Sequence, residues 1–416
     1  MSTATLRVSS PAGAPQPPGG PPLAVLALGA FAIGTDGFVI AAVLPGIARD
    51  MHVTVGAAGL LVTVFAVVYG LAAPVLTAAV ARVDRRIVLV TGMGTLSVSN
   101  FAAAFAPGEG WLMAARVIAG LGAAAYSPIA LAAAVQLSPP AQRGRAVSNV
   151  LAGMTVSLVL GVPLGALVGS VGGWRWTFGV VAAISASATV GIACLLPPIP
   201  PLRISTLRVR LALLRRPAVA ANLAATFLWI TGAFVAYTFV APVLTAATGW
   251  HGAAISVLLL LYGAAAFAGN VAGGWAADRW GATRSVMFAL ASLIVSLSAL
   301  ALAALVGPPA GTPIAISSLV AWAGAGWSLT PAQSHRLVGL TPTAGPEVLS
   351  LNTSAVYLGI AAGAAIGGEL LTHLGTAPIG LAAAVLQLLA LAVVVVARAP
   401  RTNPEAPAAA VTTARR

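Results

Sequence analysis

Long apolar stretches separated by short polar segments occupy most of the chain. Each stretch holds about 20 residues, the length that an α-helix needs to cross the hydrocarbon core of a bilayer. The pattern predicts an all-α polytopic membrane protein with twelve transmembrane helices. The predicted spans are 23–44, 57–80, 87–106, 111–136, 147–170, 177–196, 218–241, 253–276, 285–306, 313–333, 349–371 and 377–397.

The polar segments divide these spans into two sets of six. The predicted organisation is an N-terminal six-helix bundle at 23–196, a linker at 197–217 and a C-terminal six-helix bundle at 218–397. We expect the polar tails at 1–22 and 398–416 to be disordered. Within the linker, residues 207–216 combine apolar residues with four arginines and are predicted to form a short amphipathic helix on the cytoplasmic surface, which we expect to link the two halves.

Composition supports the same class of protein. Only 7% of the 416 residues are charged and 59% are hydrophobic, with a mean hydropathy of +0.99. Soluble domains have about 25% charged residues, so a soluble fold is excluded. The single cysteine, Cys194, excludes a disulfide framework and a cysteine-based metal site. No catalytic triad, metal cluster or phosphate-binding loop is recognisable, and we expect neither enzyme activity nor a cofactor or metal.

The arginines predict the orientation of the spans. All 21 basic residues are arginines, and the net charge is +13. Of these, 18 lie on one side of the predicted spans, Arg49 and Arg175 lie on the other side, and Arg116 lies within the fourth span. The positive-inside rule places the arginine-rich side, with both termini, in the cytoplasm. This distribution explains the basic character of the chain without a nucleic-acid partner.

The two halves repeat each other. Several residues of the first span recur 196 positions later, and three glycines of the fifth span recur after 198 positions. The pairs are Phe31 and Phe227, Thr35 and Thr231, Phe38 and Phe234, Val39 and Val235, Gly161 and Gly359, Gly165 and Gly363, and Gly169 and Gly367. The agreement among offsets predicts a duplicated six-span unit. Because six is even, the two copies insert in the same direction and form parallel repeats.

Five short segments carry recognisable patterns in matching spans. They are Asp278-Arg279-Trp280-Gly281 between Gly274 and Arg284, its altered first-half copy at 81–86, Leu112-x3-Arg116-x3-Gly120 in the fourth span, Gly161-Val162-Pro163-Leu164-Gly165 in the fifth, and Gly173–Phe178 before the sixth. In this order they resemble the motifs of the major facilitator superfamily, in its twelve-span drug:proton antiporter branch of bacterial multidrug, chloramphenicol- and sugar-efflux-like carriers. Three places depart from the family pattern: Ala81 replaces an aspartate, Ala119 replaces a glutamine in the fourth-span motif, and Val162-Pro163 replaces Gly-Pro.

The resemblance implies the major facilitator fold and a role for each motif. It implies proton coupling through Arg116 and an antiporter-motif helix around Gly161, Pro163 and Gly165. It also implies a cytoplasmic gating loop, formed by Gly274, Asp278, Arg279, Gly281 and Arg284. For the first-half copy, a solvated Asp84 is the simpler interpretation.

Asp36 and Arg116 are charged residues inside predicted spans, where a charge costs about 2.5–3.5 kcal/mol at the bilayer centre. Helix rise places Asp36 about 12 Å and Arg116 about 8 Å from the outer ends of their spans, so the two can share one level. A neighbouring arginine favours the charged carboxylate, and separation in a dry environment favours the protonated form. We therefore predict that Asp36 and Arg116 serve proton coupling. The alternative is a structural ion pair that never titrates.

The glycines of the fifth span lie at positions i, i+4 and i+8, on one helix face. Small faces let helices approach closely. The stripe is consistent with static packing or with sliding of this span against the eighth or eleventh. Pro163 removes a backbone hydrogen bond and is expected to kink the helix.

Large aromatic side chains at the depth of the bilayer centre are candidates for a substrate cavity. They are Phe38, Trp229, Phe234, Tyr237, Trp327 and Tyr357. Such residues can line a pocket for an apolar compound, and the alternative is packing within the bundles. Trp111, Trp174, Trp250 and Trp280 lie at span ends and are expected to be interfacial anchors. Glu369 is expected to be an exposed carboxylate at the outer mouth, with His373 in the loop beyond it.

These observations predict proton-coupled efflux of small, amphipathic, drug-like molecules by alternating access. The alternatives are efflux of sugars or another polar metabolite, import, or a non-transporting sensor or scaffold with the same fold. The expected partners are the substrate, protons and the lipid bilayer, and the expected state is a multi-pass monomer in a bacterial cytoplasmic membrane. The sequence does not identify the substrate.

Overall fold

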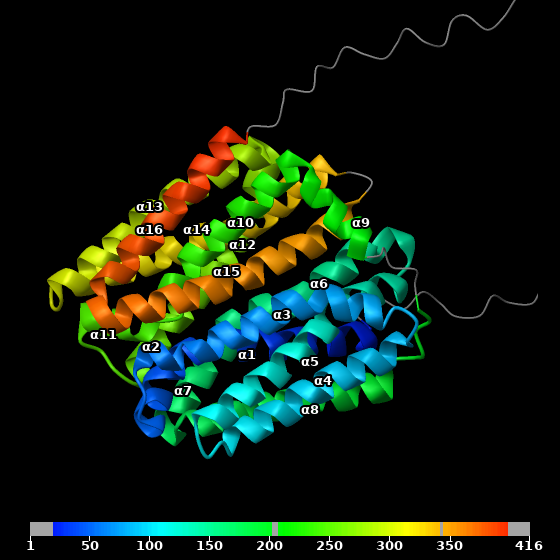
Figure 1. The fold of residues 1–416 in the computed structure, drawn as a ribbon, viewed down its shortest axis with the longest axis horizontal. Helices are drawn as coiled ribbons and strands as arrows, with labels where there is room; N and C mark the ends of the chain where they lie inside the picture. Colours follow the sequence, from blue (N-terminus) through cyan, green and yellow to red (C-terminus); the bar gives the residue numbers. More distant parts are fainter. Residues whose placement is uncertain (1–19, 202–206, 342–343, 398–416) are drawn as a thin grey trace, which may run out of the picture.

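The computed structural model describes residues 20–201, 207–341 and 344–397. Every regular element in these ranges is helical, and no strand is present in them (Figure 1). Of the two predicted disordered tails, only residues 20–22 and none of 398–416 fall within the described part of the chain. The described part of the fold is thus helical, as the apolar pattern predicts.

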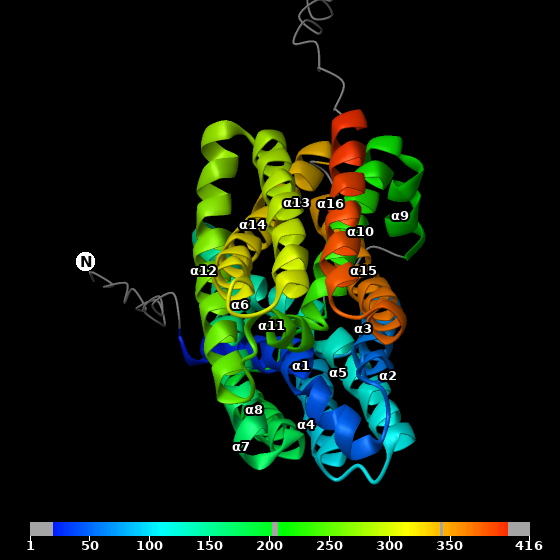
Figure 2. The same cartoon turned by 90° about the vertical axis from the view of Figure 1, so that its left-hand side faces the viewer.

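The helices of the first half and those of the second half form two bundles (Figures 1 and 2). The first bundle contains α1 (Pro21–Met51), α2 (Val55–Ala58), α3 (Leu60–Ala79), α4 (Arg85–Ala104), α5 (Glu109–Gln136), η1 (Pro140–Gln142), α6 (Arg143–Val156), η2 (Ser157–Gly161), α7 (Val162–Gly172) and α8 (Trp174–Leu195). The linker contains α9 (Leu207–Ala212) and η3 (Leu213–Arg215). The second bundle contains α10 (Pro217–Tyr237), α11 (Val240–Thr248), α12 (Ala253–Trp280), α13 (Ala282–Val306), α14 (Gly311–Leu340), α15 (Gly345–Leu374) and α16 (Ala377–Val396).

Eleven helical segments of the described chain are long and apolar enough to cross a membrane. The tenth predicted span corresponds to α14, which has 30 residues but is less apolar than the others. Glycine, serine and tryptophan residues lower its hydropathy. α14 nevertheless packs closely against α12 and α13 and buries Trp322 in the core of the second bundle. α14 therefore corresponds to the tenth predicted span and, with the other eleven segments, completes the set of twelve.

The seventh span is not the continuous helix that the pattern predicts. α10 ends at Tyr237 and α11 begins at Val240, with a turn at Thr238 and Phe239 between them. Pro242 explains the break, because it cannot donate a hydrogen bond to the carbonyl of Thr238 and its ring clashes with that carbonyl. The seventh span therefore consists of two helices, α10 and α11, separated by this turn.

The fifth span is interrupted where the sequence predicts a kink. Residues Ser157–Gly161 form a π-helical segment, η2, between α6 and α7, and Pro163 follows two residues later. A π-helical turn accommodates the hydrogen bond that proline cannot make, and such turns are frequent at functional sites. The irregularity is therefore wider than a simple proline kink.

The glycine stripe of the fifth span faces the first span. A Cβ atom added at Gly161, Gly165 or Gly169 would collide with the side chains of Thr35, Val39 and Val43 of α1. Of the two alternatives, sliding of this stripe against the eighth or eleventh span is therefore not supported. The second half repeats the arrangement, since Gly359, Gly363 and Gly367 pack in the same way against α10.

The same side-chain hydrogen bond occurs at matching positions of the first helix in each half. The hydroxyl of Thr35 donates to the carbonyl of Phe31 over 2.8 Å, and that of Thr231 donates to the carbonyl of Phe227 over 2.7 Å. The matching bonds and the matching glycine contacts lie within each bundle. The glycines thus hold the first and fifth spans of a half together, which favours the static-packing interpretation.

The most extensive contacts between the two bundles involve two places along their interface. α3 packs against α15, and α12 packs against η2 and α7. Gly263 of α12 lies so close to the backbone of Leu158 that a side chain at this position would collide with it. Here we call the helix ends joined at 80–85, 137–143, 196–217, 280–282 and 341–345 the arginine-rich end, and the other end of the molecule the opposite end.

Candidate functional site

Asp36 of α1 and Arg116 of α5 form an ion pair inside the first bundle. Nη1 of Arg116 donates to both carboxylate oxygens of Asp36, over 2.9 and 3.0 Å. Each side chain is only 1% exposed. The two residues are 80 positions apart in sequence, and the structure brings them to one level as helix rise predicts. A low-dielectric interior strengthens this attraction and makes separation of the charges costly.

The rest of the Arg116 guanidinium is held by packing. Its central carbon lies 4.3 Å from the centre of the Phe65 ring in α3, a cation–π arrangement. Nε and Nη2 are buried and have no hydrogen-bond acceptor among the described residues. The ion pair is therefore not part of a larger network of protein hydrogen bonds that would fix it in one geometry.

Aromatic rings continue from Phe65 to the second bundle. The ring centres of Phe65 and Tyr69 are 6.1 Å apart in α3, and those of Tyr69 and Tyr357 of α15 are 3.5 Å apart and nearly parallel. The rings of Phe65, Tyr69 and Tyr357 thus form a continuous row from the guanidinium of Arg116 to α15. The surroundings of the ion pair therefore include a residue of the other bundle.

Four of the six predicted cavity aromatics form one cluster across the bundles. The Phe38 ring centre lies 6.1 Å from that of Phe234, 5.7 Å from that of Tyr237 and 5.9 Å from that of Trp327. The hydroxyl of Tyr237 also reaches the Phe38 carbonyl, at 3.5 Å. The fifth, Tyr357, stacks on Tyr69 instead. Trp229 is buried and has no ring contact with another aromatic in the described chain, so its place in this cluster is not supported.

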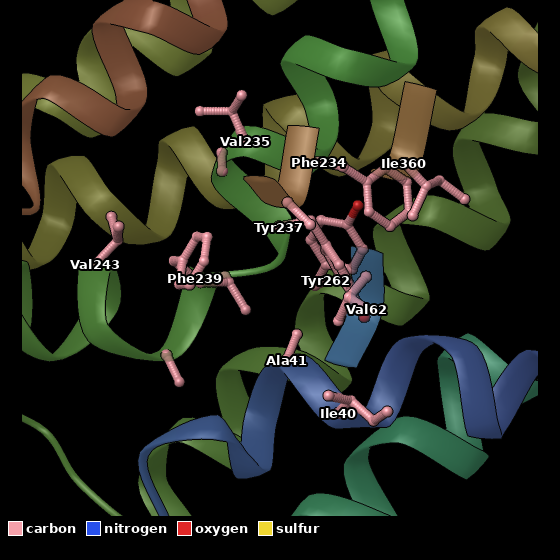
Figure 3. Packing of buried hydrophobic residues seen from close by; sticks show 14 of the residues in the cluster. Ile40, Ala41, Val62, Phe234, Val235, Tyr237, Phe239, Val243, Tyr262 and Ile360 are labelled. Carbon is pink, nitrogen blue, oxygen red and sulfur yellow. The ribbon is translucent and has the colours of Figure 1, made fainter. Parts of the chain in front are cut away.

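The cluster extends to residues that the sequence interpretation missed. Tyr262 of α12 lies 5.3 Å from Tyr237, and Trp322 of α14 lies 5.2 Å from Tyr262, measured between ring centres. Figure 3 shows Tyr237 and Tyr262 above Val62 and Ala41 of the first bundle. Like Tyr69, Tyr262 and Trp322 lie in the middle of predicted spans. Their distance from the span ends could therefore have marked them as candidates for the cavity.

The predicted cytoplasmic gating loop is not a loop. Asp278 and Arg279 belong to the last turn of α12, and Arg284 to the first turn of α13. Gly281 alone joins the two helices, with φ of +85°, a conformation that side-chain-bearing residues rarely adopt. Gly274 has open space beside it. Asp278 and Arg279 are exposed, and neither forms an ion pair with a described residue.

Two other carboxylates have structural explanations. Asp84 caps α4, because its Oδ1 accepts a hydrogen bond from the backbone N–H of Arg86 over 2.8 Å. Glu369 is 81% exposed and pairs with His373 at 3.3 Å. His373 is in the last turn of α15 and not in the loop beyond it, because the helix continues to Leu374.

An ion pair at the opposite end joins three segments. Asp50 of α1 accepts hydrogen bonds from the indole of Trp174 and from Arg175, each over 2.9 Å. Arg175 also donates to the carbonyl of Ala106. Trp174 is only 2% exposed, so its predicted role as an interfacial anchor is wrong. Trp111, Trp250 and Trp280 are 55%, 40% and 48% exposed, as expected of anchors.

The linker packs against both bundles through α9 and η3. These elements contact α3, α10 and α15. The predicted amphipathic segment buries an arginine, since Arg210 is 5% exposed and donates to Ser350 of α15 over 3.1 Å, while Val209 and Leu211 are exposed. Burial lowers the pKa of Arg210, and the nearby Glu347 acts in the opposite direction.

Comparison with known proteins identifies the family. The model of the Major Facilitator Superfamily matches residues 26–343. Among curated relatives, the uncharacterized MFS-type transporter YbcL of Bacillus subtilis is 34% identical over 85% of this chain and 90% of its own length. A chloramphenicol resistance protein of Streptomyces lividans is 36% identical, over 85% and 89%. A probable sugar efflux transporter of Mannheimia succiniciproducens is 30% identical, over 87% and 90%.

Solved structures share the fold. A bacterial homolog of the human lysosomal transporter Spinster, crystallised in an inward-facing and unoccupied conformation, superposes with a TM-score of 0.71. The match covers 92% of this chain and 98% of that one, with 17% sequence identity. At this identity the similarity concerns the architecture alone, and it agrees with the arrangement of two six-helix bundles.

Proposed function

Since this chain belongs to the major facilitator superfamily, we propose that it exports small, amphipathic, drug-like molecules in exchange for protons. The observation that carries the proposal is the buried pair of Asp36 and Arg116. A transporter driven by protons needs an ionisable group inside the membrane, and this pair is buried where both groups would otherwise be costly. A sensor or scaffold with the same fold has no need of such a pair.

In the proposed cycle, the ion pair exists in two states. When Arg116 contacts Asp36, the carboxylate is favoured in its charged form. When the contact breaks in the dry interior, the carboxyl takes up a proton, because an isolated charge there is unfavourable. Tyr357 of the second bundle stacks on Tyr69 near the pair, so rearrangement of the bundles changes the surroundings of Asp36. Proton binding and bundle movement are linked in this way.

Contacts between the bundles support an inward-facing conformation. At the opposite end, Gly56 is packed against Gly368 and Thr372, and Gly59 against Phe239, with no space for a side chain. Thr63 donates to the carbonyl of Ala361 across the same interface, over 3.4 Å. In this conformation, substrate cannot pass between the bundles at the opposite end. The aromatic cluster around Phe38 then lies on the inner side of this closed contact. Substrate is expected to enter from the arginine-rich side.

Export of drug-like compounds is favoured over the alternatives by the aromatic cluster. Phe38, Phe234, Tyr237 and Trp327 offer apolar and π surfaces, which suit a partly aromatic molecule. A relative named for chloramphenicol resistance supports the same choice. Efflux of a sugar or another polar metabolite is the second candidate, because a further relative is named a probable sugar efflux transporter. Aromatic rings also bind sugar faces, so only transport measurements separate the two.

We expect both termini and the linker to lie in the cytoplasm. Alkaline phosphatase fused after Arg210 should be inactive, because the enzyme folds only outside the cytoplasm, and fused after Gly110 it should be active. The expected contrast follows from the arginine distribution. Activity at Arg210 and none at Gly110 would reverse the orientation and assign the arginine-rich end to the outside.

Transport itself is tested by a susceptibility panel. Cells that express the protein should tolerate several-fold higher concentrations of at least one amphipathic drug than cells without it, and an uncoupler should abolish the difference in drug accumulation. A panel of sugars and sugar analogues provides the second arm. Protection against sugar analogues alone would favour the second candidate. Expression that changes the accumulation of no compound would contradict an efflux function.

A further inference from the structure

The second bundle contains a cluster of polar side chains that has no role in the proposed proton coupling through Asp36 and Arg116. Gln333 of α14 donates through Nε2 to the carbonyl of Asn222 over 2.8 Å and to the hydroxyl of Thr226 over 3.1 Å, both in α10. Thr226 in turn donates to Oδ1 of Asn352 in α15, over 2.9 Å. Gln333, Asn222 and Thr226 are at most 3% exposed. Three helices thus share a buried network near the arginine-rich end.

An arginine completes this network. Nη1 of Arg336 donates to Oε1 of Gln333 over 3.2 Å, and the Arg336 side chain is half-buried. No acidic side chain of the described residues forms an ion pair with it. Arg336 lies four residues before the end of α14, about 6 Å along the helix, so its remaining guanidinium donors are reachable from the arginine-rich side.

The cluster presents unused hydrogen-bonding groups. Oδ1 of Asn352 accepts from Thr226, which leaves the two N–H donors of its amide without an acceptor among the described residues. Oδ1 of Asn222 is buried and also has no partner there, but it is an acceptor that a water can satisfy, so the unused donors of the cluster are those of Asn352 and Arg336. Buried polar groups are nearly always paired, so an incomplete network points to a missing ligand or water. The donors, with the positive charge of Arg336, favour an acceptor that carries negative charge.

The first half has no equivalent cluster. At the repeat offset of 196, Asn222 and Thr226 correspond to Leu26 and Ala30, and at the offset of 198, Asn352 corresponds to Met154. There a single buried hydrogen bond, from the hydroxyl of Tyr126 to the carbonyl of Leu26 over 2.9 Å, takes the place of the network. The additional polar side chains of the second half therefore exceed what this part of the fold requires, and polar groups inside a membrane bundle are costly.

We propose that Arg336, Gln333 and Asn352 form a subsite for a carboxylate of the transported molecule. Gln333 holds the guanidinium in place, and Arg336 and Asn352 donate to the carboxylate oxygens. The proposal rests on the exporter function, since a cytoplasmic subsite is where an exported molecule first binds. It makes organic anions, or molecules with one carboxylate beside an aromatic body, the favoured substrate class.

Two dyes that share a xanthene ring system and differ in their N-alkyl and ring-methyl groups test this subsite, because each variant is compared with the wild-type protein for the same dye. Rhodamine B carries a free carboxylate, and rhodamine 6G carries an ester in its place. Their binding to purified protein in detergent is measured by fluorescence anisotropy. Arg336→Gln should weaken rhodamine B binding about tenfold and leave rhodamine 6G binding within about twofold, since one charge-assisted contact is lost. Arg336→Lys should retain part of the affinity, because it keeps the charge and loses the fork geometry.

Matched variants complete the design. Arg145→Gln removes an exposed arginine at the same end and should leave the binding of both dyes unchanged. Asn352→Ala should weaken the binding of rhodamine B and leave that of rhodamine 6G unchanged. It provides the test of the subsite if Arg336→Gln does not fold. Equal weakening of both dyes, no weakening, or no binding of rhodamine B by the wild-type protein would overturn the proposal. The assay needs no proton gradient, so loss of proton-driven transport with intact dye discrimination would instead contradict the exporter function.

Discussion

Asp36→Asn is expected to abolish proton-driven efflux while the protein still folds and binds substrate. Asparagine has the shape of a protonated aspartate and can still accept a hydrogen bond from Nη1 of Arg116, but it cannot release a proton. Inverted membrane vesicles with an acidic interior provide the measurement. The wild-type protein should accumulate a substrate found in the susceptibility panel, and the variant should show no accumulation above vesicles without the protein.

The pH dependence of binding should change in the same variant. If substrate and proton compete through Asp36, each weakens the binding of the other by the same factor, so wild-type affinity falls as pH is lowered. In Asp36→Asn this fall should be flattened. Asp50→Asn is the matched control, because Asp50 pairs with Arg175 at the surface and is 50% exposed. Such pairs contribute about 0–1 kcal/mol, and transport should stay within about twofold of wild type. Accumulation by Asp36→Asn at the wild-type rate would remove Asp36 from the mechanism.

Arg116→Ala is expected to abolish drug resistance although the protein still reaches the membrane. The change removes the positive charge that is paired with Asp36 and empties the space over the Phe65 ring. Breaking a buried ion pair from one side costs about 3–5 kcal/mol if the remaining charge persists. Uptake of a proton by Asp36 relieves that cost and fixes the carrier in its protonated state. Resistance and membrane abundance, measured on the same cells, separate lost transport from lost protein.

Two further variants distinguish a coupling role from a purely structural one. Arg116→Lys should be partly active, since a single nitrogen makes both contacts to Asp36 and lysine can supply it, but the flat stacking on Phe65 is lost. Combining Asp36→Asn with Arg116→Ala should restore stability, because no unpaired charge remains, without restoring transport. Full resistance in Arg116→Ala, or in the double variant, would reduce the pair to packing.

The sequence pattern predicts the helices well because a membrane imposes one rule on all of them. Each span must be apolar over the bilayer thickness, and only helices satisfy their backbone hydrogen bonds there. A helix that is surrounded by other helices instead of lipid does not need to be apolar along its whole length. α14 shows this, because its glycines, serines and tryptophans pack against α12 and α13. The break at Thr238 is a local effect of Pro242, and proline spacing alone could have predicted it.

Depth along a helix is easier to predict than rotation around it. The rise per residue suffices to place Asp36 and Arg116 at one level, and the 2.9 Å contact agrees with it. The same arithmetic does not indicate which side a glycine stripe faces, so the sequence alone does not reveal that Gly161, Gly165 and Gly169 pack against α1. The contacts of Asp50 with Trp174 and Arg175 bridge 124 and 125 positions, and no local pattern predicts them.

Proton release upon substrate binding tests the central claim most directly. Purified protein in weakly buffered detergent is mixed with saturating substrate, and a pH indicator reports the protons released. The account predicts release by the wild-type protein and a smaller release by Asp36→Asn at the same extent of binding. If the variant releases as many protons as the wild type, Asp36 is not the coupling site, and Glu369 or a carboxylate at the helix ends would have to take its place.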